Sequence, residues 1–227
     1  MVPNATLNQP PEPTHGRSIP WNPLPDAGLA LASIQLSRQT GALVLLCARD
    51  EQHAYQLEAT CRFFADDDCP VLHFPDMEIL PYDALSPLPE VVSERLAALA
   101  RIPTLHTGVV IVGADNLLQR LPPPSFVEAR SLSVTQGQTL SPLSLRETLD
   151  RAGYQAVAEV QSHGEYALRG ALMDLFPMGS PSPYRIDWLD DDIDSIRLID
   201  TATQRPHATA HRIPQLPTTP SPLSHPH

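Results

Sequence analysis

Acidic side chains are the most concentrated chemical groups in this chain. Aspartate fills residues 66–68 and all but one position of residues 190–194. A calcium loop of the EF-hand type needs alternate aspartates, a glycine and a later glutamate, and neither run has that order. We therefore predict that both runs are solvated turns. His207 and His211 lie close together, but in a proline-rich segment, and we expect no metal site there.

Nucleotide chemistry would need a glycine-rich turn followed by a lysine that reaches the phosphates. All 15 basic residues are arginine, so the lysine is missing. Gly108 and Gly113 have a suitable spacing, but the intervening VVIV is typical of a strand, and Ala114 and Asp115 follow where lysine and a hydroxyl residue would stand. The sequence therefore predicts no nucleotide or other cofactor, and we expect no catalytic residue in this chain.

The overall composition narrows the class of partner. The chain has 227 residues and a net charge of −11, with no cluster of basic residues. Autonomous nucleic-acid binding is unexpected, because neutralising phosphates supplies most of that affinity. The 3 cysteines are too far apart for a CxxC site, and we expect them to be reduced and mostly buried in a cytoplasmic protein. No apolar run has the length of a membrane span.

The remaining residues of interest suit contact with another protein. Residues 184–189 alternate apolar and polar side chains, as in a strand with one face on a core. Arg185 and Leu189 lie on its polar face. We interpret residues 163–177 as one extended stretch interrupted at a glycine, with Arg169 on its polar face. Together Arg169, Arg185 and Leu189 are predicted to form a patch for a partner.

Two folded parts must position these residues. Residues 26–124 alternate helices with short apolar runs. We expect 43–47 to be a strand buried on both faces, 71–74 a second short strand and 109–112 a third, buried strand. This pattern predicts an α/β domain, a parallel sheet flanked by helices, with a boundary at the proline run that ends it.

The second folded part has a different sequence pattern. Residues 125–205 contain several short strand patterns and one short helix pattern, which predicts a small α+β domain. Residues 1–25 and 206–227 are rich in proline and lack an apolar period. We expect both to be disordered, the second as a proline- and histidine-rich tail.

Several long motifs occur in an order that resembles the N-terminal, UvrB-like module of the bacterial transcription-repair coupling factors (Mfd). The likeness covers roughly residues 43–205. It is carried by GEYALRGALMDLFP (164–177), YRIDWLDDDIDSIRLID (184–200), FPDMEILPYDALSP (74–87), SERLAALARIPT (93–104) and GVVIVGADNLLQRLPPPSF (108–126).

The resemblance implies a function for each part. Residues 26–124 would be a degenerate, nucleotide-free copy of a helicase-like P-loop domain, here incomplete. Residues 125–205 would bind UvrA through two arginines and an aromatic, which fall on Arg169, Arg185 and Leu189. Leu189 departs from the pattern, so an aromatic anchor is missing. We expect truncation of Arg185 to weaken binding while leaving the melting temperature nearly unchanged.

The family as a whole is an ATP-dependent DNA translocase that recruits UvrA to polymerase stalled at DNA damage. RNA polymerase and DNA would bind only through domains missing from this chain, and a natural truncation or a frameshift would explain their absence. The chain itself would be a non-catalytic recruiting module. Two alternatives stay open: a fragment of an ATP-dependent, UvrB-like DNA-binding enzyme, and an inert truncation product.

Overall fold

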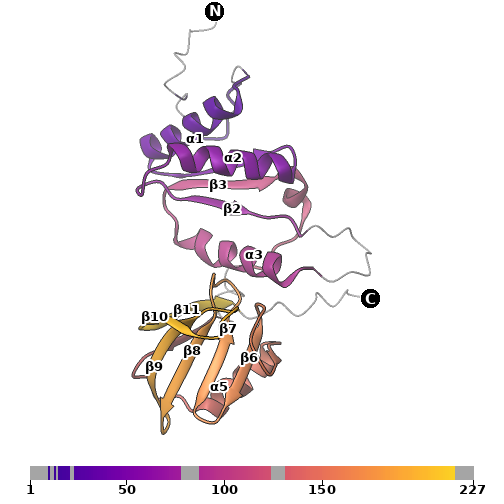
Figure 1. Cartoon of the computed structure of the whole chain (residues 1–227). Helices are drawn as coiled ribbons and strands as arrows, with labels where there is room; N and C mark the ends of the chain where they lie inside the picture. The colour runs from indigo at the N-terminus through magenta and orange to yellow at the C-terminus, as the bar shows by residue number, and fades with distance from the viewer. Residues whose placement is uncertain are drawn as a thin grey trace, which may run out of the picture. The chain divides into compact units, whose positions relative to one another are not determined.

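The computed structural model describes residues 10, 13, 15–20, 23–77, 87–123 and 131–217. Two compact units share the chain: the first unit contains Met1–Asp76 and Arg101–Leu121, and the second contains Met77–Ala100 and Pro122–His227. The chain therefore leaves the first unit once to contribute a helix to the second (Figure 1).

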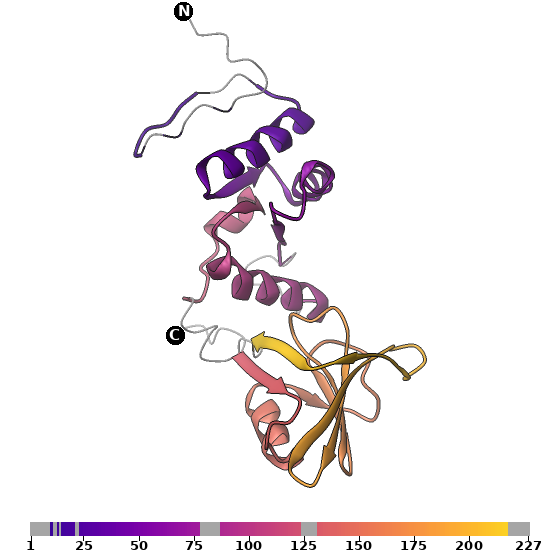
Figure 2. The ribbon, with the colours of Figure 1, turned by 90° about the vertical axis from the view of Figure 1, so that its left-hand side faces the viewer.

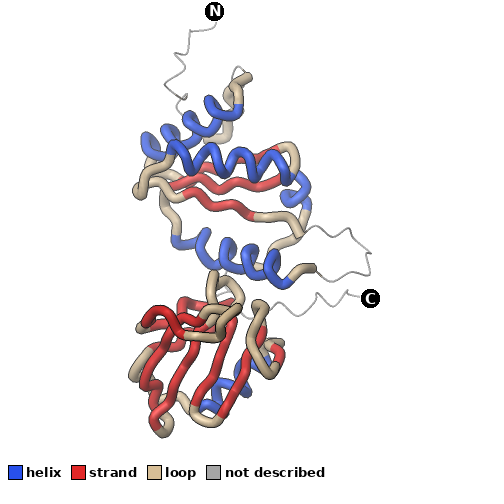
Figure 3. The backbone as a smooth tube through the Cα atoms, in the orientation of Figure 1, coloured by secondary structure: helices blue, strands red, loops and turns tan. Residues whose placement is uncertain are grey.

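The first unit is built on a small parallel sheet, which confirms the α/β prediction. Its strands β1 (Leu43–Ala48), β2 (Val71–Phe74) and β3 (Gly108–Gly113) are arranged in the order β1-β3-β2. Helices α1 (Asp26–Thr40) and α2 (Glu51–Phe64) lie together on one side of it (Figure 3). Their apolar side chains form a core with alternate residues of β1 and β3. Two short 3-10 helices, η1 (Ile102–Thr104) and η2 (Ala114–Leu118), flank β3.

The three strands of this sheet are not equally buried. Every residue of the central strand β3 is buried. Strand β1 pairs only with β3 in the described structure, and Leu45 is 58% exposed. Cys47 is exposed as well, so the expected burial of β1 on both faces is wrong. An apolar run has the same appearance in a central strand and in an edge strand, because only pairing distinguishes them.

Helix α3 (Pro89–Arg101) differs from the predicted division of the chain. Residues 77–100 fall in the second unit, whereas the sequence pattern assigned them to a domain of residues 26–124. The Ser93 hydroxyl accepts a hydrogen bond from the Gly179 amide at 2.7 Å, and Leu96 joins the core of the second unit. The units change again at Leu121–Pro122, close to the predicted boundary.

The second unit has one large sheet and one small one, as expected for an α+β domain. The large sheet has the order β10-β9-β8-β7-β6-β5, and the small sheet pairs β11 with β4. Helix α5 (Pro142–Arg151) contributes Leu145 and Leu149 to a core that fills one face of the large sheet. The strands are β4 (Ser131–Thr135), β5 (Gln155–Ala156), β6 (Glu165–Arg169), β7 (Leu172–Phe176), β8 (Tyr184–Leu189), β9 (Asp192–Ile199), β10 (Pro206–Ala210) and β11 (Arg212–Pro217).

Residues 163–177 are not one extended stretch. They contain the antiparallel hairpin β6–β7, in which Arg169 pairs with Leu172 across a two-residue turn. Gly170 has φ of 64°, the left-handed conformation that a tight hairpin turn requires and glycine adopts without strain. The glycine expected to interrupt one strand therefore reverses the chain, and it places β7 between the two strands that carry Arg169 and Arg185.

The expected disorder of residues 206–227 is wrong for residues 206–217. Strand β10 pairs with β9, and β11 pairs with β4. Figure 2 shows the yellow strand β11 beside β4. The Ile213 side chain is fully buried in the core of the second unit. Residues 218–227 and most of residues 1–25 lie outside the described residues.

Candidate partner-binding face

The large sheet of the second unit has a core face and an opposite face, here called the polar face. Arg169 pairs with Leu172, which pairs with Asp187 of β8. Directly opposed residues point to the same side of a sheet, and alternate residues along a strand do so too. Arg169, Arg185 and Leu189 therefore share the polar face, and they come from strands separated by β7.

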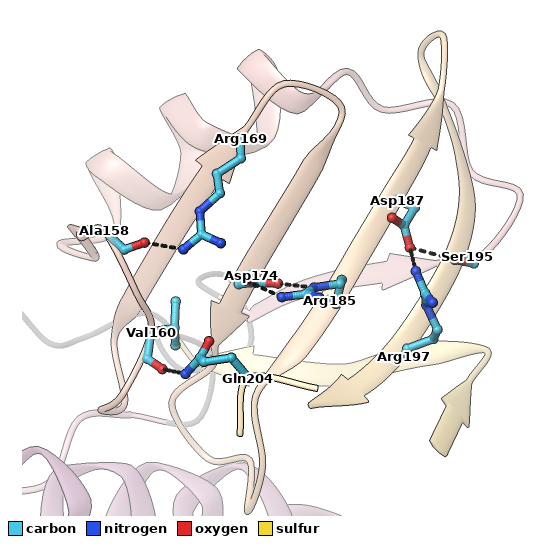
Figure 4. Close-up of polar contacts among 9 residues, drawn as sticks. All are labelled: Ala158, Val160, Arg169, Asp174, Arg185, Asp187, Ser195, Arg197 and Gln204. Carbon is cyan, nitrogen blue, oxygen red and sulfur yellow. Dashed lines mark hydrogen bonds and ion pairs between the residues drawn. The ribbon is translucent and has the colours of Figure 1, made fainter. Parts of the chain in front are cut away.

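Arg185 is held by a carboxylate that sequence reasoning missed. Its Nε and Nη2 atoms donate to Asp174 Oδ1 at 2.7 Å and to Oδ2 at 2.8 Å (Figure 4). The Asp174 side chain is 0% exposed and that of Arg185 16%. The hydrogen-bonded Asp174 raises the pKa of Arg185 above its ordinary value. A guanidinium has five N–H donors, so this pairing leaves donors for a partner.

Arg169 is also fixed by an acceptor. Its Nη2 atom donates to the Ala158 carbonyl oxygen, which joins β6 to the segment that follows β5 (Figure 4). The residue as a whole is exposed. The long side chain therefore keeps a defined direction at the surface, which reduces the rotamer entropy lost when a partner binds.

Leu189 ends β8 beside the acidic hairpin turn. It is 69% exposed and pairs with Asp192, the first residue of β9. Asp190 adopts φ of 56°, as in a tight turn. The predicted strand–acidic turn–strand is therefore present, and no group of three or more potential metal ligands occurs among the described residues.

A second arginine–aspartate pair lies on the same face. Arg197 Nη2 donates to Asp187 Oδ2 at 2.5 Å, and Ser195 Oγ donates to the same oxygen at 2.9 Å (Figure 4). Arg197 is not among the contact residues predicted from the sequence. The alternation of Ile196 and Leu198 around it on β9 was the available evidence, since it places Arg197 away from the core.

One end of the polar face is covered and the other is open. Val160, Ala167 and Phe176 form a small buried cluster at the covered end. Gln204 Nε2 donates to the Val160 carbonyl oxygen at 3.0 Å, and this hydrogen bond fixes the segment around Val160 that covers this end. At the opposite end of the same strands Arg169 and Leu189 are exposed. A partner thus has access to the end that carries the predicted residues.

In the first unit, the turn after β1 is where a parallel α/β domain binds phosphate. Here only Arg49 and Asp50 join β1 to α2. Asp50 caps the helix, since its carboxylate accepts from the His53 amide at 2.7 Å, and this hydrogen bond lowers the pKa of Asp50. A carboxylate occupies the place where a phosphate would be bound.

Comparisons with known proteins match the second unit, which carries the polar face, and most of the rest of the chain. A family model described as the UvrB interaction domain matches residues 132–220, which extends beyond residue 205, where the likeness inferred from the sequence ended. The transcription-repair-coupling factor of Escherichia coli K12 is 43% identical over 194 residues, covering 86% of this chain and 17% of the relative. That of Haemophilus influenzae is 42% identical over 199 residues, covering 87% of this chain and 17% of the relative.

More distant relatives carry the same name. The transcription-repair-coupling factor of Bacillus subtilis is 27% identical over 139 residues, or 61% of this chain and 12% of the relative. The chain thus spans less than a fifth of the length of these relatives. Within the part of the chain that the structure describes, no helix is long and apolar enough to span a membrane.

Proposed function

Over the 86% of its length that aligns, this chain belongs to the transcription-repair-coupling factor family, and from that premise we propose that its second unit binds UvrA. The chain is then a recruiting module that brings nucleotide excision repair to stalled transcription complexes. The match of residues 132–220 to the UvrB interaction domain supports this assignment for the second unit.

One observation carries the proposal: arginines that are already hydrogen-bonded in place lie on an open sheet face inside the matched region. Arg185 is held by Asp174 and Arg169 by the Ala158 carbonyl. Fixed guanidinium groups lose little entropy on binding and suit carboxylates, which they contact through parallel hydrogen bonds. Leu189 adds an exposed apolar contact at the same end of the face.

The module needs no nucleotide for this role. The helix N-terminus after β1 is capped by Asp50, and the chain contains no lysine to reach a phosphate. Any binding of RNA polymerase and any translocation on DNA would depend on parts of the family protein that lie outside the matched length. Binding of UvrA by the chain alone is therefore the activity to test.

The test is a titration of purified UvrA with the full chain, without polymerase, DNA or ATP. We expect a dissociation constant of about 1 μM or lower, and an Arg169→Ala variant should bind roughly tenfold more weakly. The Arg151→Ala variant is the matched control, because Arg151 is also exposed and hydrogen-bonded to a backbone carbonyl, but on α5. Absence of binding by the wild-type chain at micromolar concentration would refute the proposal.

A further inference from the structure

Arg185 and Arg197 lie directly opposite each other on neighbouring strands of the polar face. Like charges in opposed positions of a sheet repel, and a sheet stabilised only for folding would avoid them. Two aspartates reduce the repulsion. Figure 4 shows the Arg185 side chain turned towards Asp174 and the Arg197 side chain turned towards Asp187. The arrangement keeps three cations, including Arg169, on one face at a cost in stability.

Arg197 has hydrogen-bonding capacity to spare. Its side chain is 39% exposed, more than twice the 16% of Arg185. Only its Nη2 atom is bonded to Asp187, and its Nε atom is buried without an acceptor among the described residues. Asp187 also accepts from Ser195, so its oxygen is shared. A guanidinium has five N–H donors, so the exposed end of this side chain keeps donors that can bind an acceptor of a partner.

We propose that Arg197 is a further contact residue of the UvrA-binding face, and that this face receives an acidic segment of the partner lying across β6 to β9. This inference rests on the proposed function and extends it to the chemistry of the partner. Carboxylates of the segment would pair with the unused donors of Arg169, Arg185 and Arg197. The three guanidinium groups follow one another across the sheet, which suits an extended chain more than a single anion.

Carboxylates of a protein suit this face better than the phosphates of a nucleic acid. The three arginines share the polar face with the aspartates that bond two of them, Asp174 and Asp187, and with Glu165 and Asp192, so the face as a whole has no positive excess. The acidic turn at residues 190–192 adjoins it, and the whole chain carries −11. Nucleic-acid affinity depends on neutralising many phosphates at once, which this distribution opposes. A few fixed hydrogen bonds to carboxylates need no large positive potential.

The deciding variant is Arg197→Gln, with Arg212→Gln as its control. Glutamine removes the charge but can still donate to Asp187. Arg212 lies on β11 in the small sheet, where its Nε atom donates to Ser133 Oγ at 3.2 Å, so the control removes the same charge from the same unit. We expect Arg197→Gln to weaken UvrA binding roughly tenfold and to reduce its dependence on salt. Arg212→Gln should bind within about twofold of wild type.

The salt dependence separates contact from folding. A folding defect lowers the fraction of active protein and leaves the slope of affinity against salt concentration unchanged. Two outcomes would overturn this inference and leave the proposed function standing. In the first, Arg197→Gln binds more weakly but with the same salt dependence as wild type. In the second, Arg197→Gln binds with wild-type affinity while Arg169→Gln binds weakly. A wild-type chain that binds no UvrA would instead overturn the proposed function. If the wild-type chain binds a DNA duplex and the Arg197→Gln variant does not, the assignment of this face to carboxylates of a protein is overturned.

Discussion

At the scale of single residues, the pair of Arg185 and Asp174 has two roles that are difficult to separate. A carboxylate with no solvent exposure is stable only when its charge is compensated, and Arg185 supplies that compensation. The same carboxylate directs Arg185 at the surface. Asp174 is therefore a positioning residue for the proposed contact, and any change at Arg185 also changes the environment of a buried charge.

The first prediction corrects the expectation that truncation of Arg185 leaves stability unchanged. Arg185→Ala leaves the Asp174 carboxylate buried without its partner, which costs about 3–5 kcal/mol. Urea denaturation at neutral pH measures the loss. Arg169→Ala, which removes an exposed arginine bonded to a backbone carbonyl, should cost less than about 1.5 kcal/mol.

Replacing both Asp174 and Arg185 by apolar residues tests whether the unpaired buried carboxylate causes this loss of stability. In the double variant Asp174→Leu with Arg185→Met no buried charge remains, and stability should return to within about 2 kcal/mol of wild type. UvrA binding should stay weak, because the guanidinium is absent. A single variant Arg185→Ala as stable as wild type would show that Asp174 finds another partner or takes up a proton.

Leu189 leads to a second prediction. It is 69% exposed at the open end of the polar face, where the family pattern has an aromatic. Leu189→Phe enlarges the apolar contact and should strengthen UvrA binding about threefold to tenfold. Leu143→Phe is the control, since Leu143 is 63% exposed on α5. Equal effects of both variants in a titration would indicate general stickiness and not a specific contact.

At the scale of elements, the start of β3 shows how closely the first unit is packed. Gly108 has φ of 125°, and a Cβ atom there would lie 2.4 Å from the Pro70 carbonyl oxygen. That oxygen also accepts from the Val109 amide at 2.9 Å, so the contact belongs to the strand pairing. The glycine is required because backbone meets backbone at this point.

The third prediction follows from this contact. Gly108→Ala should destabilise the first unit by more than about 2 kcal/mol, because backbone strain and a steric clash add. Gly41→Ala is the control: it has φ of 63° and nothing within 4 Å of the added atom, so only strain of about 1 kcal/mol is expected. Thermal melts compare the two. A Gly108→Ala melt no lower than that of Gly41→Ala would show that the clash is relieved.

At the scale of the whole molecule, α3 links the two units through the chain. It lies in sequence between β2 and β3 of the first unit, yet Leu96 belongs to the core of the second unit. Ser93 adds its hydrogen bond with Gly179. A fragment that begins at the predicted boundary near residue 125 therefore lacks part of the core that it needs.

The fourth prediction uses this helix. Leu96→Ala should cost about 2–5 kcal/mol, since Leu96 is 5% exposed, and the loss should appear in the second unit. Hydrogen exchange should accelerate in β7 and β8 and stay unchanged in β1 and β3. Leu88→Ala, at a residue that is 61% exposed, should have little effect. Faster exchange confined to the first unit would contradict the division of the chain.

The sequence alone predicted what depends on neighbouring residues. Alternation along a strand is local, so the polar faces of Arg169, Arg185 and Leu189 could be inferred without knowing which strands pair. The parallel sheet followed from apolar runs separated by helix patterns, and the family likeness followed from its motifs, now extended to residue 220 by the family model.

The tertiary structure decided what depends on pairing between distant residues. Only the β7–β8 pairing brings Asp174 beside Arg185, and only the β8–β9 register brings Arg197 opposite Arg185. Residues 206–217 have too few apolar side chains to predict strands, but β9 and β4 supply their hydrogen bonds. Pairing energy comes from the partner strand, and a local pattern contains no record of it.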